Sequence, residues 1–147
     1  MKWLLDTNVV SEGIRPRPDQ AVLRWIADQP PDDLSISDVT LAELKVGAAG
    51  FADDVQRRRF DNWFLRTIEL FQGRTLPVTV EILTHWLNLA RQLRMRGRPQ
   101  SGPDLLIAST ARIHGLTVVS RNVRDFAETG ILVYDPWSGQ THRTDAP

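Results

Sequence analysis

Four carboxylates and one amide stand beside segments of this sequence that have the patterns of strands or of helix starts. They are Asp6, Glu43, Asp104, Asn122 and Asp125. Asp6 directly follows an apolar run at the N-terminus, and Asn122 closely follows a later β-branched run. Glu43 lies one to two turns into the helix expected after the second strand, and Asp104 is at the head of another helix. If these helices begin at the sheet edge where the strands end, three carboxylates and an amide converge on one cleft, namely Asp6, Glu43, Asp104 and Asn122.

A group of this composition favours one class of chemistry. Clustered carboxylates repel one another, so without a counterion their ionisation is disfavoured and a carboxyl pKa rises. Oxygen ligands without His or Cys suit Mg²⁺ or Mn²⁺ rather than Zn²⁺. Such an ion generates a hydroxide-like nucleophile and polarises a phosphate. The pattern therefore favours metal-dependent phosphodiester hydrolysis, with Asp6 and Asp104 as main ligands. Glu43 is either a third ligand, direct or through water, or a residue that orients the nucleophile.

Each acidic residue also has a purely structural interpretation. Asp6 has the position of a helix N-cap, and Asp104 has that of a side chain complementing a helix dipole. Glu43 is also interpretable as a solvated helix charge, and Asp125 as a turn or cap residue. No single residue decides between the two interpretations. Their occurrence in order, each beside a strand, favours a shared site.

The elements that must position these residues alternate along the chain. Strands are expected at 3–5, 34–36, 116–119 and 131–134, helical segments at 19–29, 38–50, 53–71, 80–95 and 104–114, a connector or strand at 75–78 and a turn or helical piece at 122–126. This alternation predicts an α/β fold in which helices cover both faces of a mostly parallel sheet. Ligand sites in such sheets lie beyond the carboxyl ends of the strands.

Composition limits the alternatives. A chain of 147 residues with 41% hydrophobic and 24% charged residues is the size of one globular domain. The 18 basic and 18 acidic residues balance, which excludes a strongly basic nucleic-acid packaging protein. No cysteine is present, and no apolar run is long enough to span a membrane. We expect a soluble, cytoplasmic protein with one domain at 1–137 and a polar, frayed tail at 138–147.

The basic residues are almost all arginine, since only Lys2 and Lys45 of the 18 cations are lysines. Four arginines precede Asp104, at positions 91, 94, 96 and 98, and Arg121 and Arg124 flank Asn122. Guanidinium groups suit phosphate contacts. A solvated helix face explains positions 91–98 equally well, and genomic base composition can produce the overall bias.

Four blocks of sequence resemble the PIN-domain ribonucleases, specifically toxins of VapBC-type or FitAB-like toxin–antitoxin pairs. The blocks are LLDTNVVSE at 4–12, SDVTLAELKVG at 37–47, PDLLIASTA at 103–111 and GLTVVSRNVRDF at 115–126. The ending VYDPW at 133–137 also resembles the FitB branch. The first block alone is weakly specific, whereas all four in order at this chain length form a strong signal.

The resemblance implies a three-layer α/β/α sandwich with about five strands and RNA cleavage that depends on Mg²⁺ or Mn²⁺. The family's acidic positions fall on Asp6, Glu43 and Asp104. Its fourth position falls on Asn122, where many members have Asp. The amide adds no negative charge, so the sequence leaves open whether one or two metals bind, and Asp125 can compensate through water. The hydroxyl side chains expected beside these acids are Thr7, Thr40 and Ser120.

The resemblance also implies partners. Family toxins are generally homodimers, and a small antitoxin holds them inactive by covering the cleft. Five aromatic residues are candidates either for the core or for such a contact: Trp25, Phe51, Phe60, Trp63 and Phe64. On the substrate side, Arg98, Arg121 and Arg124 are the expected contacts to RNA phosphates.

Three competing interpretations remain. A DNA nuclease or 5′-nuclease relative uses the same carboxylates, but the chain has no room for an extra arch or helical domain. A phosphoacceptor receiver domain needs a lysine near a late strand, and both lysines precede residue 46. A non-catalytic interaction module is favoured by the missing charge at Asn122.

Overall fold

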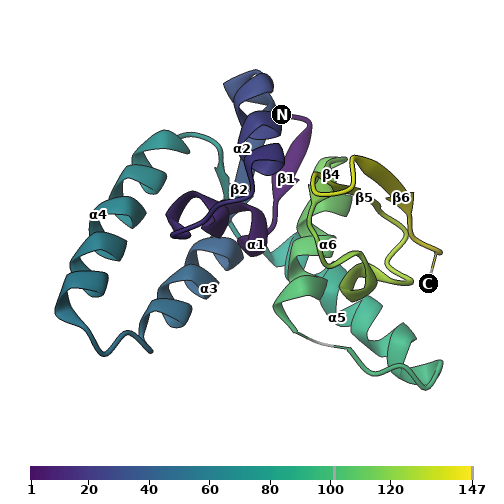
Figure 1. Ribbon diagram of the computed structural model, residues 1–147. Coiled ribbons are helices and arrows are strands. Elements are labelled where there is room, and N and C mark those ends of the chain that lie inside the picture. Colours follow the sequence, from purple (N-terminus) through teal and green to yellow (C-terminus); the bar gives the residue numbers. More distant parts are fainter. Residues whose placement is uncertain (101, 147) are drawn as a thin grey trace.

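The structure is a computed structural model that describes residues 1–100 and 102–146 (Figure 1). Its elements in chain order are β1 (Trp3–Leu5), α1 (Thr7–Val10), α2 (Gln20–Asp28), β2 (Leu34–Ser37), α3 (Asp38–Ala48), α4 (Asp54–Leu70), β3 (Thr75–Leu76), α5 (Val80–Met95), α6 (Pro103–His114), β4 (Thr117–Val119), β5 (Leu132–Asp135) and β6 (Gln140–Arg143). Short 3-10 helices span Ser11–Ile14, Pro31–Asp33 and Val123–Phe126. The expected alternation of strands and helices is confirmed.

One sheet of six strands, in the order β3-β2-β1-β4-β5-β6, forms the centre of the described chain. The first five strands in this order run parallel, which confirms the predicted α/β architecture. β1 pairs with both β2 and β4, so residues from the start and from the end of the sequence meet at the middle of the sheet. The carboxyl ends of β1 and β4 therefore lie side by side.

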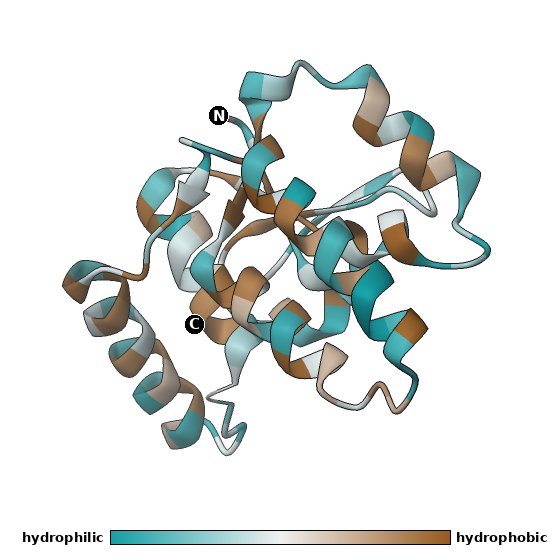
Figure 2. Ribbon diagram, turned by 90° about the vertical axis from the view of Figure 1, so that its left-hand side faces the viewer, coloured by the Kyte–Doolittle hydropathy of each residue, from teal (hydrophilic) through white to brown (hydrophobic). Residues whose placement is uncertain are grey.

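Helices cover both faces of the sheet because successive strand residues point to opposite sides. Leu4 and Val118 belong to the core beneath α6, whereas Leu5 and Val119 belong to the core beneath α1, α2 and α4. α5 packs outside α6, where Leu93 and its neighbours form a third apolar cluster. Figure 1 shows α4 and α5 on opposite sides of the molecule, and Figure 2 shows helices striped with hydrophilic and hydrophobic residues around the sheet.

The segment expected to be a frayed tail is partly ordered sheet, so that expectation is wrong for residues 140–143. Gln140–Arg143 forms β6, which pairs antiparallel with β5. Thr144 continues the attachment, since its Oγ1 accepts from the Ile131 backbone N at 2.9 Å. The sequence conceals this strand because an exposed edge strand needs no alternation of apolar residues, and charged residues are typical there.

Candidate active site

Asp6 is the centre of the candidate site, and it is almost fully buried, with 3% of its surface exposed. It directly follows β1 and caps the N-terminus of α1. Its Oδ1 accepts from the Thr7 backbone N at 2.7 Å, and its Oδ2 accepts from Asn8 Nδ2 at 2.9 Å and from Ser120 Oγ at 2.6 Å. Capping and site formation are thus compatible roles. Three donors fix the carboxylate in one orientation.

Ser120 reaches Asp6 because β4 pairs with β1 in a register that sets Leu5 opposite Val119. Ser120 is fully buried. Its Oγ donates to Asp6 and accepts from Asn8 Nδ2 and from the Asn122 backbone N, each at 3.0 Å. The expected hydroxyl neighbour of the acid is therefore in contact with it.

Glu43 approaches the same region from α3, and it is half-buried. Thr7 Oγ1 donates to Glu43 Oε2 at 2.5 Å, so Thr7 links the helices α1 and α3 and orients this second carboxylate. Thr40 has a different role from the one expected. Its buried Oγ1 donates to the Leu5 backbone O at 3.3 Å, which fastens α3 to β1. Thr40 thus positions the helix that carries Glu43.

Asp104 lies in the first turn of α6 and is half-buried. Burial is the main cause that raises its pKa from 3.8 to about 6, and the charges of Asp6, Asp125 and Glu43 raise it further. Burial likewise raises the pKa of Asp6, although the hydrogen bonds from Ser120 and from the Thr7 backbone lower it, and Glu43 and Asp125 add to the rise. Glu43 and Asp125 therefore lie close enough to Asp6 and Asp104 to raise the pKa of both.

Within the described part of the chain, no cation forms an ion pair with the acidic cluster, which we define as Asp6, Glu43, Asp104 and Asp125. In the described residues the ion pairs within 4.0 Å are Glu12 with Arg15 and Glu128 with Arg98, and neither involves the cluster. A recess of about 260 Å³ is lined by Asp104 and Asp125 together with Gln100, Gly102 and Leu105. The negative charge thus borders an open recess.

The cluster is not a closed set of metal ligands. Within residues 1–100 and 102–146, no three His, Cys, Asp or Glu side chains are gathered tightly enough to hold an ion by themselves. The donor chemistry nevertheless fits Mg²⁺ or Mn²⁺, because all the donors are oxygens and their charge is uncompensated. Mg²⁺ usually keeps several waters and needs only one or two carboxylates, so a preassembled cage is not required.

Asn122, at the position expected to carry a fourth acid, is attached to the site through its backbone. Its N–H donates to Ser120 Oγ at 3.0 Å, whereas its amide side chain does not cap the 3-10 helix that follows. One turn later the Asp125 backbone N donates to the Asn122 O at 3.0 Å. Asp125 is therefore the residue that brings charge from this segment to the cluster, as its effect on the pKa of Asp6 and Asp104 indicates.

Asn8 is part of the site, although its position in the sequence did not single it out. Its Nδ2 donates to both Asp6 and Ser120, and its Oδ1 accepts from the Arg121 backbone N at 3.3 Å. Asn8 thus joins β1 to the loop after β4. The available signal was its place two residues after an N-cap aspartate, where an amide can turn back to the carboxylate.

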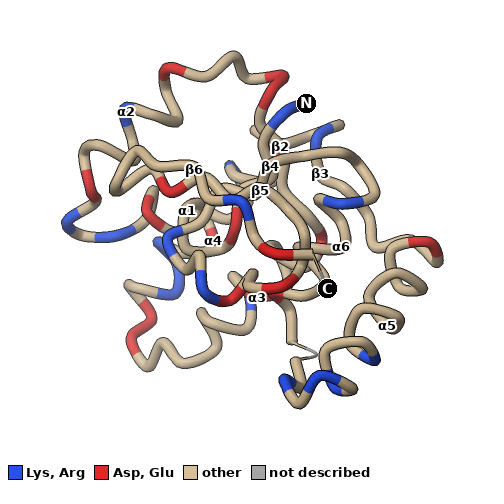
Figure 3. The backbone as a smooth tube through the Cα atoms, turned by 90° about the vertical axis from the view of Figure 1, so that its right-hand side faces the viewer, with Lys and Arg blue, Asp and Glu red and all other residues tan. Residues whose placement is uncertain are grey.

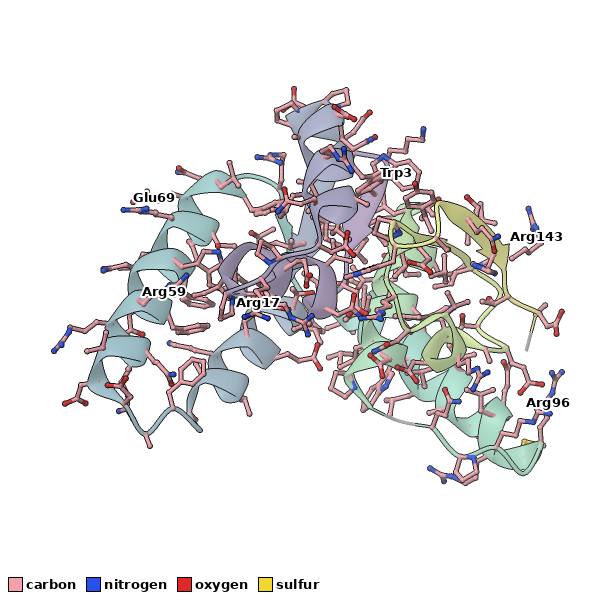
Figure 4. The ribbon with its side chains drawn as sticks, viewed as in Figure 1. Trp3, Arg17, Arg59, Glu69, Arg96 and Arg143 are labelled. Carbon is pink, nitrogen blue, oxygen red and sulfur yellow. The ribbon has the colours of Figure 1, made fainter. Side chains whose placement is uncertain are left out.

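The three arginines expected to bind phosphate differ in their surroundings. Arg98 Nη1 pairs with Glu128 Oε2 at 3.0 Å. Arg121 and Arg124 are exposed on the loop that follows β4. Figure 4 shows Arg96 and Arg143 directed outward at the edge of the molecule. Acidic and basic segments are intermingled along the backbone in Figure 3.

A second, apolar surface lies between α2 and α4, and its lining includes no residue of the acidic cluster. It borders a cavity of about 330 Å³ whose lining includes Leu23, Ile26, Ala27, Trp63 and Leu70. Of the five aromatic residues considered above, Phe60 and Phe64 are buried in the core, whereas Trp25, Phe51 and Trp63 are half-buried at its border. We call this surface the α2–α4 groove.

The chain is similar in sequence to several known proteins. The model of the PIN domain family matches residues 3–132. Toxin FitB from Neisseria gonorrhoeae is 33% identical over 138 residues, covering 91% of this chain and 97% of FitB. The tRNA(fMet)-specific endonuclease VapC from Shigella flexneri is 32% identical over 140 residues, covering 94% of this chain and 99% of the relative.

Solved structures agree with these relatives. FitAcB from Neisseria gonorrhoeae superposes with a TM-score of 0.84 and 31% identity, covering 92% of this chain and 98% of that one. DNA-bound VapBC from Salmonella typhimurium superposes with a TM-score of 0.72 and 29% identity, at the same coverage of 92% and 98%. Among the described residues, no helix is both long and apolar enough to cross a membrane.

Proposed function

This chain belongs to the PIN-domain family, and we propose that it is a metal-dependent endoribonuclease that acts as the toxin of a VapBC-type toxin–antitoxin pair. The observation that carries the proposal is the acidic cluster at the carboxyl edge of the sheet, whose charge no cation of the described chain offsets. Such a cluster is costly without a ligand, because raised pKa values mean that its charged form is disfavoured. A divalent cation removes that cost.

Asp6 and Asp104 would hold Mg²⁺ or Mn²⁺, with Glu43 and Asp125 contributing directly or through water. When bound, the ion would polarise the scissile phosphate and lower the pKa of a water molecule. The chain's own residues supply orientation. Ser120 and Asn8 hold the Asp6 carboxylate, and Thr7 directs Oε2 of Glu43 by donating to it.

RNA is the proposed substrate, and exposed guanidinium groups at the mouth of the cluster would hold its phosphates. The exposure of both arginines supports this role, with Arg121 on the loop after β4 and Arg124 in the 3-10 helix Val123–Phe126. Arg98 would take part only by exchanging its partner Glu128 for a phosphate. Names of relatives support RNA over DNA, since they include a VapC ribonuclease from Sinorhizobium fredii at 34% identity over 135 residues.

The partner we propose is a small antitoxin. Structures similar to this chain are toxin–antitoxin complexes, FitAB and VapBC. The α2–α4 groove supplies an apolar surface for such a partner, because its lining is largely aliphatic and aromatic. We also propose that the chain forms a homodimer and acts in the cytoplasm.

One experiment tests the enzymatic proposal. Purified wild-type chain, Asp104→Asn and Asp6→Asn are incubated with single-stranded RNA, single-stranded DNA and tRNA, with Mg²⁺, Mn²⁺ or EDTA. We expect the wild-type chain and the control variant named next to cleave RNA but not DNA, Asp6→Asn and Asp104→Asn to cleave neither, and no protein to cleave in EDTA. Asp38→Asn is the matched control, since Asp38 is an exposed aspartate in the first turn of α3. Full activity in EDTA defeats the metal-dependent mechanism, and cleavage of DNA alone favours the DNA nuclease.

A further inference from the structure

Arg121 has a position at the acidic cluster that calls for an explanation. It directly follows Ser120, whose Oγ donates to Asp6, and its own backbone N donates to Asn8 Oδ1 at 3.3 Å. The main chain of Arg121 is thus tied to the same network that orients Asp6. A guanidinium attached this close to a group of carboxylates would be expected to pair with one of them, because charge-assisted hydrogen bonds are strong.

The guanidinium instead lies over an aromatic ring. Arg121 Cζ is 5.5 Å from the centroid of the Trp137 ring. In the described residues Arg121 forms no ion pair within 4.0 Å, and the neighbouring charges that shift the pKa of Asp6 and of Asp104 are those of carboxylates. The ring therefore holds the cation apart from the acids, and both remain available to a ligand.

Trp137 is itself firmly placed. It lies in the turn between β5 and β6 and packs half-buried against the core beneath α1 and α2. Its backbone N donates to Asp135 Oδ1 at 2.9 Å, and Ser138 Oγ donates to Asp135 Oδ2 at 2.8 Å. Gly139, in the left-handed conformation at φ 72°, donates its backbone N–H to the Asp135 O at 2.8 Å. The turn thus presents the ring as a fixed platform.

A second arginine of the chain shows what a structural contact of this type looks like. Arg74 lies over the ring of Phe71 at 5.0 Å, but its guanidinium also donates to the backbone carbonyls of Leu34 at 2.9 Å and Leu70. Its donors are used within the fold. Arg121, by contrast, is exposed, and within residues 1–100 and 102–146 its guanidinium has the ring of Trp137 as its partner. A guanidinium stacked in this way keeps its planar set of donors free for a phosphate.

We propose that Trp137 is a positioning residue that holds the guanidinium of Arg121 apart from the acidic cluster, on the loop that borders it, where the guanidinium binds an RNA phosphate. This inference rests on the proposed function, because it takes RNA as the polyanion. Substitution of the ring frees the guanidinium to collapse onto the carboxylates. RNA binding then weakens as though Arg121 itself were lost.

The test measures binding separately from cleavage. A fluorescently labelled, mixed-sequence single-stranded RNA is titrated in EDTA at several salt concentrations, and anisotropy gives Kd. We expect Arg121→Gln and Trp137→Leu each to raise Kd about three- to tenfold and to reduce the slope of log Kd against log salt by about 1. The double variant should be no more than about twofold weaker than either single variant, because both remove one contact.

Two further variants complete the design. Trp137→Phe keeps a ring face and should recover part of the affinity, which also serves if Trp137→Leu folds poorly. Arg24→Gln removes an exposed charge from α2 and should leave Kd unchanged. Unchanged binding by Trp137→Leu when Arg121→Gln is weakened overturns the positioning role, and unchanged binding by Arg121→Gln, or no binding by the wild-type chain, overturns the inference as a whole. Binding without cleavage when Mg²⁺ is added defeats the proposed function and leaves this inference standing.

Discussion

Ser120 Oγ donates a hydrogen bond to Asp6 Oδ2 at 2.6 Å across a sequence separation of 114 residues. The bond joins the ends of β4 and β1, and both side chains are buried. A hydrogen bond to a buried carboxylate contributes more than a neutral one, because the charge loses its hydration on folding. This contact therefore links the integrity of the fold to the orientation of the acid.

Replacement of Ser120 by Ala should destabilise the chain by about 2 kcal/mol, because Asp6 loses a donor and Asn8 and the Asn122 backbone lose an acceptor. Urea unfolding monitored by circular dichroism measures this. Ser138→Ala is the matched control, since Ser138 also donates to an aspartate, Asp135, but is exposed. Equal effects of the two variants would contradict the importance of burial.

Replacement of Asp104 by Asn should stabilise the metal-free chain at neutral pH. The pKa of Asp104 is raised from 3.8 to about 6 in the fold, so the folded state holds its proton more tightly and loses stability as pH rises through this window. A shift of this size corresponds to about 3 kcal/mol for a shielded group, and the partial exposure of Asp104 reduces it to about 1 kcal/mol.

The measurement is the difference in unfolding free energy between Asp104→Asn and the wild-type chain as a function of pH, in EDTA. The excess unfolding free energy of Asp104→Asn over the wild-type chain should be near zero below pH 4, grow between pH 4 and pH 6 and then level off. Asp38→Asn should show no such rise, because Asp38 is exposed and outside the cluster. If the wild-type chain is more stable than Asp104→Asn at pH 7 in EDTA, the prediction that the Asp104 charge destabilises the metal-free fold is wrong.

Divalent cations should stabilise the wild-type chain, because an ion that binds only the folded state shifts the unfolding equilibrium. We expect Mg²⁺ or Mn²⁺ to raise Tm by several degrees once the ion concentration exceeds its Kd about 100-fold, as measured by thermal unfolding. Asp6→Asn and Asp104→Asn should lose this response. An equal rise in Tm for all three proteins would indicate binding elsewhere.

Blocking the α2–α4 groove should separate inhibition from catalysis. Ala27 is exposed and lines the groove, so Ala27→Arg places a long charged side chain there without disturbing the core. We expect the variant to cleave RNA normally but to escape a co-expressed antitoxin from the neighbouring open reading frame, measured by co-purification and by growth arrest. Ala21→Arg, also an exposed alanine of α2 but outside the groove lining, is the control. Equal capture of both variants would place the antitoxin on another surface.

Local patterns in the sequence were sufficient to locate most helices and strands and to identify the acidic residues as candidates for the site. The apolar run before Asp6, Pro103 in the first turn of α6 and Gly115 at its end act through neighbours in the chain, so their consequences are visible without a structure. The same holds for the α/β architecture, because strand and helix patterns alternate. The resemblance to the PIN-domain toxins rested on these same segments.

The tertiary structure decided what depends on strands that meet across the sequence. The pairing of β1 with β4 brings Ser120 to Asp6, and the turn before β6 carries Trp137 to Arg121. The first contact was expected only through the family resemblance. The second leaves no local pattern, because a polar edge strand and a single indole look like surface in the sequence. The raised pKa of Asp104 also depends on the tertiary structure. Burial and neighbouring carboxylates raise this pKa, and residue type alone does not.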